Sequence, residues 1–168
     1  MTTLYLTRHG ESEANKSQIL QGQTPGKLTE NGIEQARALQ RKLADTPIDA
    51  FVASDLHRAI QTCKILADAH GCPVTTTVLL RERDWGSFTG RFIPDLKDAA
   101  WPDDIETLEQ LQARARNFLT WIKVTFPERT VLAVGHGIIN KAIQSVYMKK
   151  PMSALRPMDN AEVRILML

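Results

Sequence analysis

Two short apolar runs, each ending abruptly at a histidine followed by glycine, are the feature that most constrains the fold of this chain. The first is Leu4–Thr7, which leads into Arg8-His9-Gly10, and the second is "TVLAVGHG", which ends at His136-Gly137. An almost wholly apolar run is typical of a strand buried on both faces of a parallel sheet. The carboxyl ends of such strands meet at one edge, where open α/β sheets bind their ligands. We therefore expect both histidines at one ligand-binding edge.

The rest of the chain alternates between strand-like and helix-like patterns. Apolar residues recur at helical spacing after Thr29, a candidate N-cap, and the next helical pattern stops at Gly71. The strand candidates are residues 4–7, 50–53, 74–78 (an edge strand), the "TVLAVGHG" run and 161–167. The helix candidates are residues 30–43, 54–70, 107–126 and 138–148, with loops and short helices over 79–102. This alternation predicts a three-layer α/β/α sandwich with a mostly parallel central sheet.

Length and composition narrow the class of protein. The 168 residues suit one domain, 1–168, and 43% hydrophobic with 24% charged residues is the composition of a folded globular protein. A net charge of +2 gives no overall field for nucleic acid or an anionic membrane. No 18-residue apolar run is present, and Met1-Thr2-Thr3 enters the first strand without a signal-peptide pattern. We expect a cytoplasmic protein with no nucleic-acid or membrane partner. Nothing in the sequence specifies an oligomeric state.

Cationic side chains gather at the predicted strand ends. Arg8 and His9 follow the first strand, His136 follows a later one, and Arg58 lies just inside the helix after residues 50–53. Two guanidinium groups provide fork-like donors for a phosphate, and an imidazole nitrogen can attack its phosphorus. The helix after His136 would aim its first N–H groups at an anion. The pattern therefore predicts a local phosphate site.

Four ordered motifs carry a resemblance to a known family. They are "RHGESEAN" from Arg8, "SDLHRAIQT" from Ser54, Leu80-Arg81-Glu82, and Gly135-His136-Gly137. The sequence resembles the histidine phosphatase superfamily, also called the phosphoglycerate mutase-like family, over nearly its whole length. The resemblance implies the phosphoglycerate mutase-like form of the α/β/α sandwich.

The resemblance also implies catalytic roles. It makes His9 the nucleophile that forms a phosphohistidine, and Glu82 the general acid for the leaving group. Arg8, Arg58 and His136 would surround the phosphoryl oxygens, with His136 as imidazolium. Neither a metal nor another cofactor is implied.

Further residues are implied as substrate contacts, and two positions depart from the family pattern. The implied contacts to the phosphate or the substrate body are Asn15, Gln21, Gly22 and Gly137. Gly135 stands where a hydroxyl residue is common, so a polar contact is in doubt there. Asn140 stands where an arginine is common, which puts in doubt a further anion contact from that helix.

Several residues keep two interpretations. Asp84 is the substitute acid if Glu82 is not the one. For Arg81, Arg83 and Arg91, a solvated charged surface is a stronger interpretation than contact with a second anionic group of the substrate. Trp85 and Phe88 either wall the pocket or fill the core. His57 and His70, outside the motifs, are expected to be satisfied polar residues or surface groups.

Three functions are compatible with these motifs. The first is a metal-independent phosphatase acting on a small phosphorylated metabolite, such as a sugar phosphate. The second is a phosphoglycerate mutase using the same phosphohistidine, and the third is an inactive phospho-ligand binding module. The intact His9, Glu82 and His136 speak against the third. The short stretch between Glu82 and His136 favours the phosphatase, with α-ribazole phosphate, phosphoglycerates and sugar bisphosphates all open as substrates.

Overall fold

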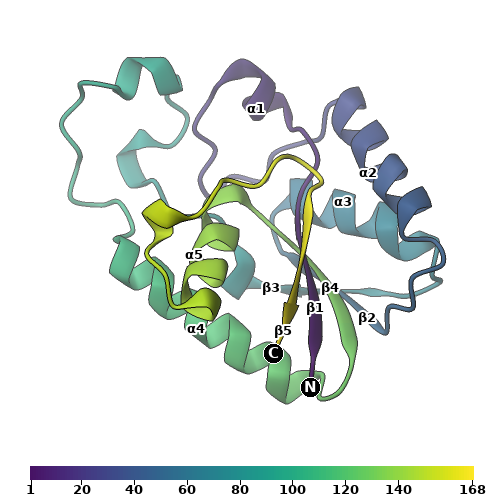
Figure 1. Cartoon of the computed structure of the whole chain (residues 1–168). Helices are drawn as coiled ribbons and strands as arrows, with labels where there is room; N and C mark the ends of the chain where they lie inside the picture. Colours follow the sequence, from purple (N-terminus) through teal and green to yellow (C-terminus); the bar gives the residue numbers. More distant parts are fainter.

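A computed structural model describes all residues, 1–168, and places a five-stranded sheet between two layers of helices (Figure 1). The strands are β1 (Thr3–Arg8), β2 (Ala50–Ser54), β3 (Val74–Thr77), β4 (Thr130–Gly135) and β5 (Val163–Met167). Their order is β3-β2-β4-β1-β5, with β5 antiparallel to β1 and every other pair parallel. The predicted α/β/α sandwich with a mostly parallel sheet is confirmed.

The long helices are divided between the two faces of the sheet. α2 (Glu30–Lys42) and α3 (His57–Asp68) cover one face, while α4 (Leu108–Thr125) and α5 (Gly137–Met148) cover the other (Figure 1). Val131 and Ala133 of β4 belong to the core beneath α4 and α5, and the alternate residues Leu132 and Val134 belong to the core beneath α2 and α3. Because successive side chains of a strand point to opposite faces, both faces of β4 must be apolar. This explains the continuous apolar run that precedes His136.

The element boundaries follow local hydrogen bonding. Thr29 caps α2 as predicted, because its Oγ1 accepts the N–H of Gly32 at 2.9 Å. β3 is the predicted edge strand but ends at Thr77, since residues 78–80 turn into the 3-10 helix η1 (Val78–Leu80). α3 begins at His57 rather than at residue 54.

One short helix, α1 (Glu13–Ser17), was not predicted. Its signal is a capping box in which Ser12 accepts the N–H of Asn15 and the Asn15 side chain accepts the N–H of Ser12. Five residues are too few to show helical apolar periodicity. The pattern that predicted the longer helices therefore could not find it.

A rim above the carboxyl edge of the sheet is built from two segments far apart in the sequence (Figure 1). One is the loop after α1, and the other contains the 3-10 helices η2 (Gly86–Phe88) and η3 (Ile93–Leu96). Main-chain hydrogen bonds join them, from Gly90 N to Leu20 O at 2.7 Å and from Leu20 N to Arg91 O at 2.9 Å. The last 3-10 helix, η4 (Met152–Ala154), lies in the connection before β5.

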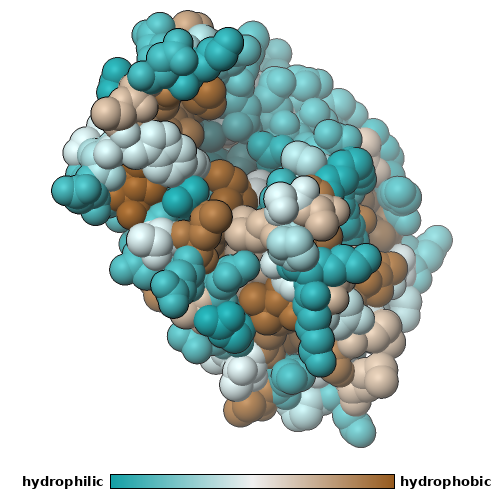
Figure 2. All heavy atoms as spheres, turned by 60° about the vertical axis from the view of Figure 1, so that its left-hand side comes forward, coloured by the Kyte–Doolittle hydropathy of each residue, from teal (hydrophilic) through white to brown (hydrophobic).

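The surface on the side of the rim carries no single large apolar patch. Figure 2 shows apolar side chains there in patches interrupted by hydrophilic ones. None of the helices combines the length and the apolar character needed to cross a lipid bilayer.

Candidate active site

A cavity of about 270 Å³ opens where the carboxyl ends of the parallel strands meet the rim. All the predicted site residues except His136 line it, namely Arg8, His9, Asn15, Gln21, Gly22, Arg58, Glu82 and Gly137. His136 is fully buried beside them, with its ring centroid 5.0 Å from that of His9. The structure thus brings together residues that the sequence spreads over 130 positions, since the first is Arg8 and the last is Gly137.

The two ring nitrogens of His9 have different partners. Its Nδ1 lies 2.6 Å from the carbonyl oxygen of Gly10. A carbonyl oxygen can only accept, so Nδ1 carries the hydrogen and Nε2 keeps its lone pair. Burial, and next the charge of Arg58, lower the pKa of His9 to about 3. His9 is therefore a neutral base whose Nε2 accepts a long hydrogen bond, 3.4 Å, from Arg58 Nε.

His136 sits at the N-cap of α5 and contacts a buried hydroxyl group. Its Nε2 lies 2.8 Å from Ser54 Oγ, and its Nδ1 is buried with no hydrogen-bond partner. Burial, followed by the charge of Arg58, holds the pKa of His136 well below its usual value. The expectation that His136 acts as an imidazolium concerns the site with a phosphoryl group bound; without an anion, burial and the neighbouring cations favour the neutral ring.

Arg58 is fixed by the main chain rather than by a carboxylate. Its Nη2 donates to Gly22 O at 2.9 Å, and its Nη1 donates to Thr24 O at 2.5 Å. The side chain is only 1% exposed, and burial lowers its pKa to about 10. Carbonyl partners orient the guanidinium without cancelling its charge, so the charge stays available to an anion near His9.

Arg8 lines the same cavity and is likewise held by a main-chain carbonyl oxygen. Its Nη1 donates to Met158 O at 2.6 Å, while its buried Nε has no partner. Burial lowers the pKa of Arg8, and the nearby Glu82 partly opposes that shift. A Cβ atom added to Gly137 would lie 3.5 Å from the guanidinium carbon of Arg8. The first residue of α5 therefore packs next to the Arg8 guanidinium group.

Glu82 is bound by the first N–H groups of α5. Ile138 N donates to Oε2 at 3.1 Å, and Ile139 N and Arg83 N donate to Oε1 at 3.0 and 2.9 Å. The sequence predicted that this helix end would face an anion, and in the structure its first N–H groups are bound by the side-chain oxygens of Glu82. The alternative acid, Asp84, lies outside this cavity in a separate acidic depression.

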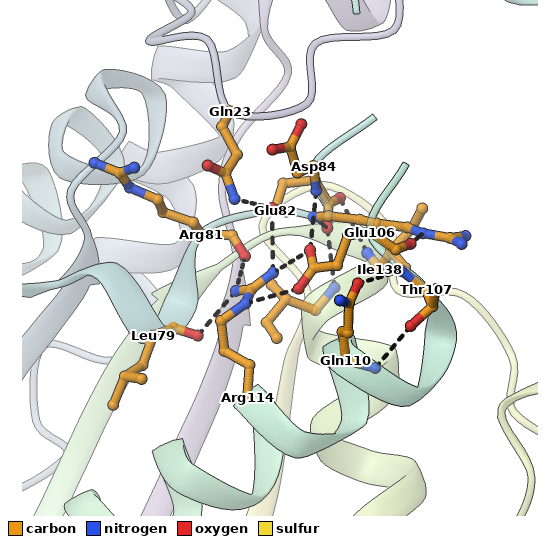
Figure 3. A network of polar contacts seen from close by, with 12 residues as sticks. Gln23, Leu79, Arg81, Glu82, Asp84, Glu106, Thr107, Gln110, Arg114 and Ile138 are labelled. Carbon is orange, nitrogen blue, oxygen red and sulfur yellow. Dashed lines mark hydrogen bonds and ion pairs between the residues drawn. The ribbon is translucent and has the colours of Figure 1, made fainter. Parts of the chain in front are cut away.

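A second layer of contacts holds the main chain of Glu82 in place (Figure 3). Arg114 of α4 donates to the carbonyl oxygens of Leu79 and Arg81, and it forms a 2.8 Å ion pair with Glu106. Gln23 donates to Glu82 O at 3.2 Å from the opposite side. Sequence reasoning missed Arg114, because a polar residue in an amphipathic helix carries no sign that it faces inward.

The predicted substrate contacts fall in two groups. Asn15 and Gly137 line the cavity together with Arg8 and Arg58, and Asn15 Oδ1 already accepts the Ser12 N–H at 3.0 Å. Gln21 donates to Ser12 Oγ at 2.8 Å and leaves its buried Oε1 without a partner. Gly22 has φ 54°, a conformation that favours glycine, and its carbonyl oxygen orients Arg58.

The two departures from the family pattern lie against each other. A Cβ on Gly135 would come within 2.2 Å of Asn140 Oδ1, so glycine at 135 is what allows asparagine at 140. Asn140 is fully buried, and its Nδ2 donates to Thr7 O at 3.0 Å. It does not face the cavity, whereas Lys141, the next residue, does.

Sequence reasoning also missed the outer wall of the cavity. Lys141 and six apolar residues complete it, namely Ile19, Leu20, Trp85, Ile93, Ile138 and Pro157. Of the open alternatives, Trp85 walls the cavity, and Phe88 is buried against Trp101.

The remaining charged candidates lie elsewhere. Arg81 forms a two-pronged pair with Asp55 at 2.7 Å, and Arg83 donates to Glu106 O and stacks on Trp85. Neither lines the cavity, and neither does Arg91, His57 or His70. No three His, Cys, Asp or Glu side chains lie together in a metal-binding arrangement.

Comparison with known proteins identifies the family. The family model described as "histidine phosphatase superfamily (branch 1)" matches residues 4–168. The chain belongs to this superfamily and is one of its enzymes.

Curated relatives include both phosphatase and mutase names. A probable phosphoglycerate mutase, GpmB, of Enterobacter sp. (strain 638) is 33% identical over 172 residues, which cover 93% of this chain and 79% of the relative. An uncharacterized phosphatase, PhoE, of Bacillus subtilis (strain 168) is 34% identical over 141 residues, covering 82% and 72%.

Among solved structures, a mycobacterial glucosyl-3-phosphoglycerate phosphatase in complex with VO3 superposes with a TM-score of 0.90. It is 29% identical, and the match covers 98% of this chain and 92% of that one. A putative alpha-ribazole-5'-P phosphatase of Escherichia coli gives 0.89 at 26% identity, covering 98% and 90%. The similar proteins therefore share the fold and a phosphate-ester chemistry, but they differ in the substrates that they are named for.

Proposed function

We propose that this protein is a metal-independent phosphatase that hydrolyses a small phosphomonoester through a phosphohistidine on His9. The observation that carries the proposal is the state of His9. Its ring is neutral with the hydrogen on Nδ1, and its Nε2 lone pair accepts only a long, 3.4 Å hydrogen bond from Arg58 Nε, which a phosphoryl oxygen can take over. A nucleophilic nitrogen beside a fixed cation is what in-line attack on phosphorus requires.

In the first step, the lone pair of His9 Nε2 forms a bond to phosphorus as the ester P–O bond breaks. Arg8 Nε, Arg58 Nε and His136 Nδ1 donate to the phosphoryl oxygens, because these are the polar atoms around His9 that lack strong partners. Glu82 gives its proton to the departing alkoxide. In the second step Glu82 takes a proton from water, the resulting hydroxide attacks phosphorus, and the P–N bond breaks to release phosphate.

His136 acts in this proposal as a neutral donor. Ser54 Oγ accepts the Leu56 N–H at 3.2 Å, so its own hydrogen is free to be donated to His136 Nε2. The ring hydrogen of His136 then lies on Nδ1, the nitrogen without a partner. Ser54 is thus a positioning residue that selects the tautomer able to bind a phosphoryl oxygen.

Hydrolysis is favoured over mutase chemistry by the short chain around the cavity. A mutase must shield its phosphohistidine from water until the product has turned round. The 83–106 segment, from which a cap would be made, is tied to itself by Arg83 to Glu106 O at 2.7 Å and Ser87 N to Asp104 at 2.9 Å. Little chain is left to close over the site.

The test is phosphate release from a panel of phosphomonoesters, including p-nitrophenyl phosphate, with and without EDTA. Wild type should release phosphate equally in both, and His9→Ala should lose at least about a thousandfold in kcat/KM. His57→Ala, in an exposed histidine outside the cavity, is the matched control. A His9→Ala protein that keeps a tenth of the activity would remove His9 from the mechanism. Conversion of 3-phosphoglycerate to 2-phosphoglycerate without phosphate release would instead establish a mutase.

A further inference from the structure

Arg114 on α4 takes no part in the proposed phosphoryl transfer, yet it binds the main chain around the acid (Figure 3). Its guanidinium group donates to three carbonyl oxygens, those of Leu79 at 3.1 Å, of Arg81, and of Glu82 at 3.4 Å. It also makes two hydrogen bonds to the Glu106 carboxylate, at 2.8 and 3.1 Å. The side chains of this ion pair are only 17% and 13% exposed, so water competes little for these contacts.

Residues 81–85 need such contacts because they form no regular secondary structure. In a strand or helix, main-chain N–H groups satisfy and fix the carbonyl groups, whereas a loop inside the protein has to find other donors. The planar, forked guanidinium group supplies several donors in fixed directions. Arg114 therefore fixes the main chain at Glu82 in the way that a neighbouring strand would fix a residue of a sheet.

Glu106, the partner of Arg114, fixes the residues that follow the acid. Its carboxylate accepts the N–H of Asp84 at 3.0 Å, and its own N–H donates to Asp84 O at 2.9 Å. Its carbonyl oxygen accepts Arg83 Nε at 2.7 Å. The chain after Glu82 is therefore bound to the same ion pair as the chain before it.

The side chain of Glu82 has contacts of a different kind, and its role as the acid must change them. Three N–H groups bind its oxygens in the structure, those of Arg83, Ile138 and Ile139. A protonated carboxyl group has to direct one oxygen, as a hydroxyl donor, to the leaving oxygen, which weakens the N–H contact of that oxygen. The main-chain contacts of Arg114 do not depend on this proton. Arg114 thus holds Glu82 in the step in which the Glu82 side chain is held least firmly.

We propose that Arg114 is a positioning residue that, together with Glu106, keeps Glu82 within hydrogen-bond reach of the leaving oxygen. This inference rests on the proposed phosphatase function, in which Glu82 is the acid. It deepens that function because Arg114 does not line the cavity, yet it is assigned a share in one step, the protonation of the leaving group, and none in binding the phosphate.

Arg114→Lys tests the proposal by kinetics. Lysine keeps a charge for Glu106 but is a single point donor, so it cannot bind the carboxylate and the carbonyl oxygens together. On glycerol 3-phosphate, kcat/KM should fall by about ten- to a hundredfold, as a small displacement of a reacting group can cause. On p-nitrophenyl phosphate, whose leaving group needs little protonation, it should fall by at most about threefold. Arg116→Lys, the same exchange at an exposed position of α4, should match wild type.

Two further variants test whether the effect passes through Glu82. In a Glu82→Gln background, Arg114→Lys should lower kcat/KM on glycerol 3-phosphate by at most about twofold, because the acid is already absent. Glu106→Gln removes the charge that holds Arg114 and should show the same dependence on the leaving group, with a loss of about three- to tenfold on glycerol 3-phosphate. In Arg114→Lys, no loss or an equal loss on the two esters would overturn the inference. A full further loss in the Glu82→Gln background would also overturn it.

Amide hydrogen exchange tests the same inference without turnover. In Arg114→Lys, the N–H groups of Ile138 and Ile139, which bind the Glu82 side chain, should lose at least about fivefold of their protection. The amides of β4 should keep theirs. Unchanged protection at Ile138 and Ile139 would overturn the inference. If wild type released no phosphate from any ester, the proposed function would fail, and the exchange measurement would still decide whether Arg114 positions Glu82.

Discussion

The inner and outer parts of the cavity differ in how their side chains are held. At the inner end His9, Arg58 and His136 are at most 2% exposed, and each contacts a main-chain carbonyl or a buried hydroxyl group. At the outer end Ile93 is 47% exposed, and Lys141 has no ion-pair partner. The inner side chains come from strand ends and the first turn of α3, whereas much of the outer wall comes from the rim.

This difference assigns chemistry to the inner end and substrate choice to the outer wall. Fixed, buried donors are effective in charge stabilisation because they need no rearrangement during the reaction. Exposed loop side chains change more freely, and a change in them alters which molecule fits. Substitutions at the inner end should therefore affect every substrate, and those in the outer wall should affect substrates unequally.

Glu82→Gln is expected to have the largest effect among substitutions that leave the nucleophile in place. Gln cannot protonate a leaving group, so kcat should fall by about 10² to 10³-fold on alkyl phosphates. p-Nitrophenyl phosphate, whose leaving group needs little protonation, should lose less than about tenfold by the same argument. Steady-state kinetics on both substrates make the comparison. Equal losses on both would show that Glu82 is not the acid.

The buried state of His9 should also appear in stability. Its pKa of about 3 in the folded protein lies below the ordinary value of 6.5, so the unfolded chain binds a proton that the folded chain excludes. The free energy of unfolding is therefore unaffected by His9 above about pH 6.5. It falls as pH is lowered toward 3, by about 1.4 kcal/mol per pH unit. Between about pH 5.5 and 4, His9→Asn should lower the slope of the unfolding free energy by that amount.

Urea denaturation across this range measures the slope. His57→Gln, in an exposed histidine, is the control and should match wild type. An unchanged slope in His9→Asn would mean that His9 takes up a proton in the folded state.

Ser54→Ala tests whether the inner end depends on the tautomer of His136. Loss of the Ser54 hydroxyl should reduce kcat by about tenfold with little change in KM, the size of one hydrogen bond. Nitrogen NMR should show the hydrogen on Nδ1 in wild type and a mixture of tautomers in Ser54→Ala. Ser54→Thr, which keeps the hydroxyl, should retain the wild-type spectrum. A wild-type spectrum with the hydrogen on Nε2 would contradict the proposed donor role.

The smallest effect is expected in the outer wall. Ile93→Ala removes apolar contact from a half-exposed position, so KM should change by about two- to fivefold and by different factors for different esters. The pH dependence of kcat should stay that of wild type. A uniform change in kcat across all esters would mean that the rim takes part in the chemistry.

The inner site could be predicted because its residues are contiguous with strand ends. Arg8-His9-Gly10 and Gly135-His136-Gly137 stand where apolar runs stop, and parallel strand ends meet at one edge. Lys141 and Arg114 could not be predicted in the same way. Each is a polar residue within an amphipathic helix, and only the packing of α4 and α5 against distant segments gives it a partner or a cavity.

The fold shows the same division. Alternating patterns predicted the layers and the edge position of β3, but not the order of the five strands or the antiparallel direction of β5. Strand order depends on pairings between segments far apart in the chain, which local periodicity does not encode. For the same reason, the sequence did not show that Glu82 accepts hydrogen bonds from the first N–H groups of α5. Glu82 lies in a loop 56 residues before Ile138.

Trapping the phosphoenzyme tests the central claim most directly. Wild type is mixed with a labelled phosphomonoester, quenched rapidly in alkali, digested and mapped, and phosphorus NMR then identifies the nitrogen that carries the label. The account predicts an acid-labile phosphoryl group on Nε2 of His9, because Nδ1 is bound to Gly10 O. A label on any other residue, on Nδ1 of His9, or absent from an enzyme that is turning over would contradict it.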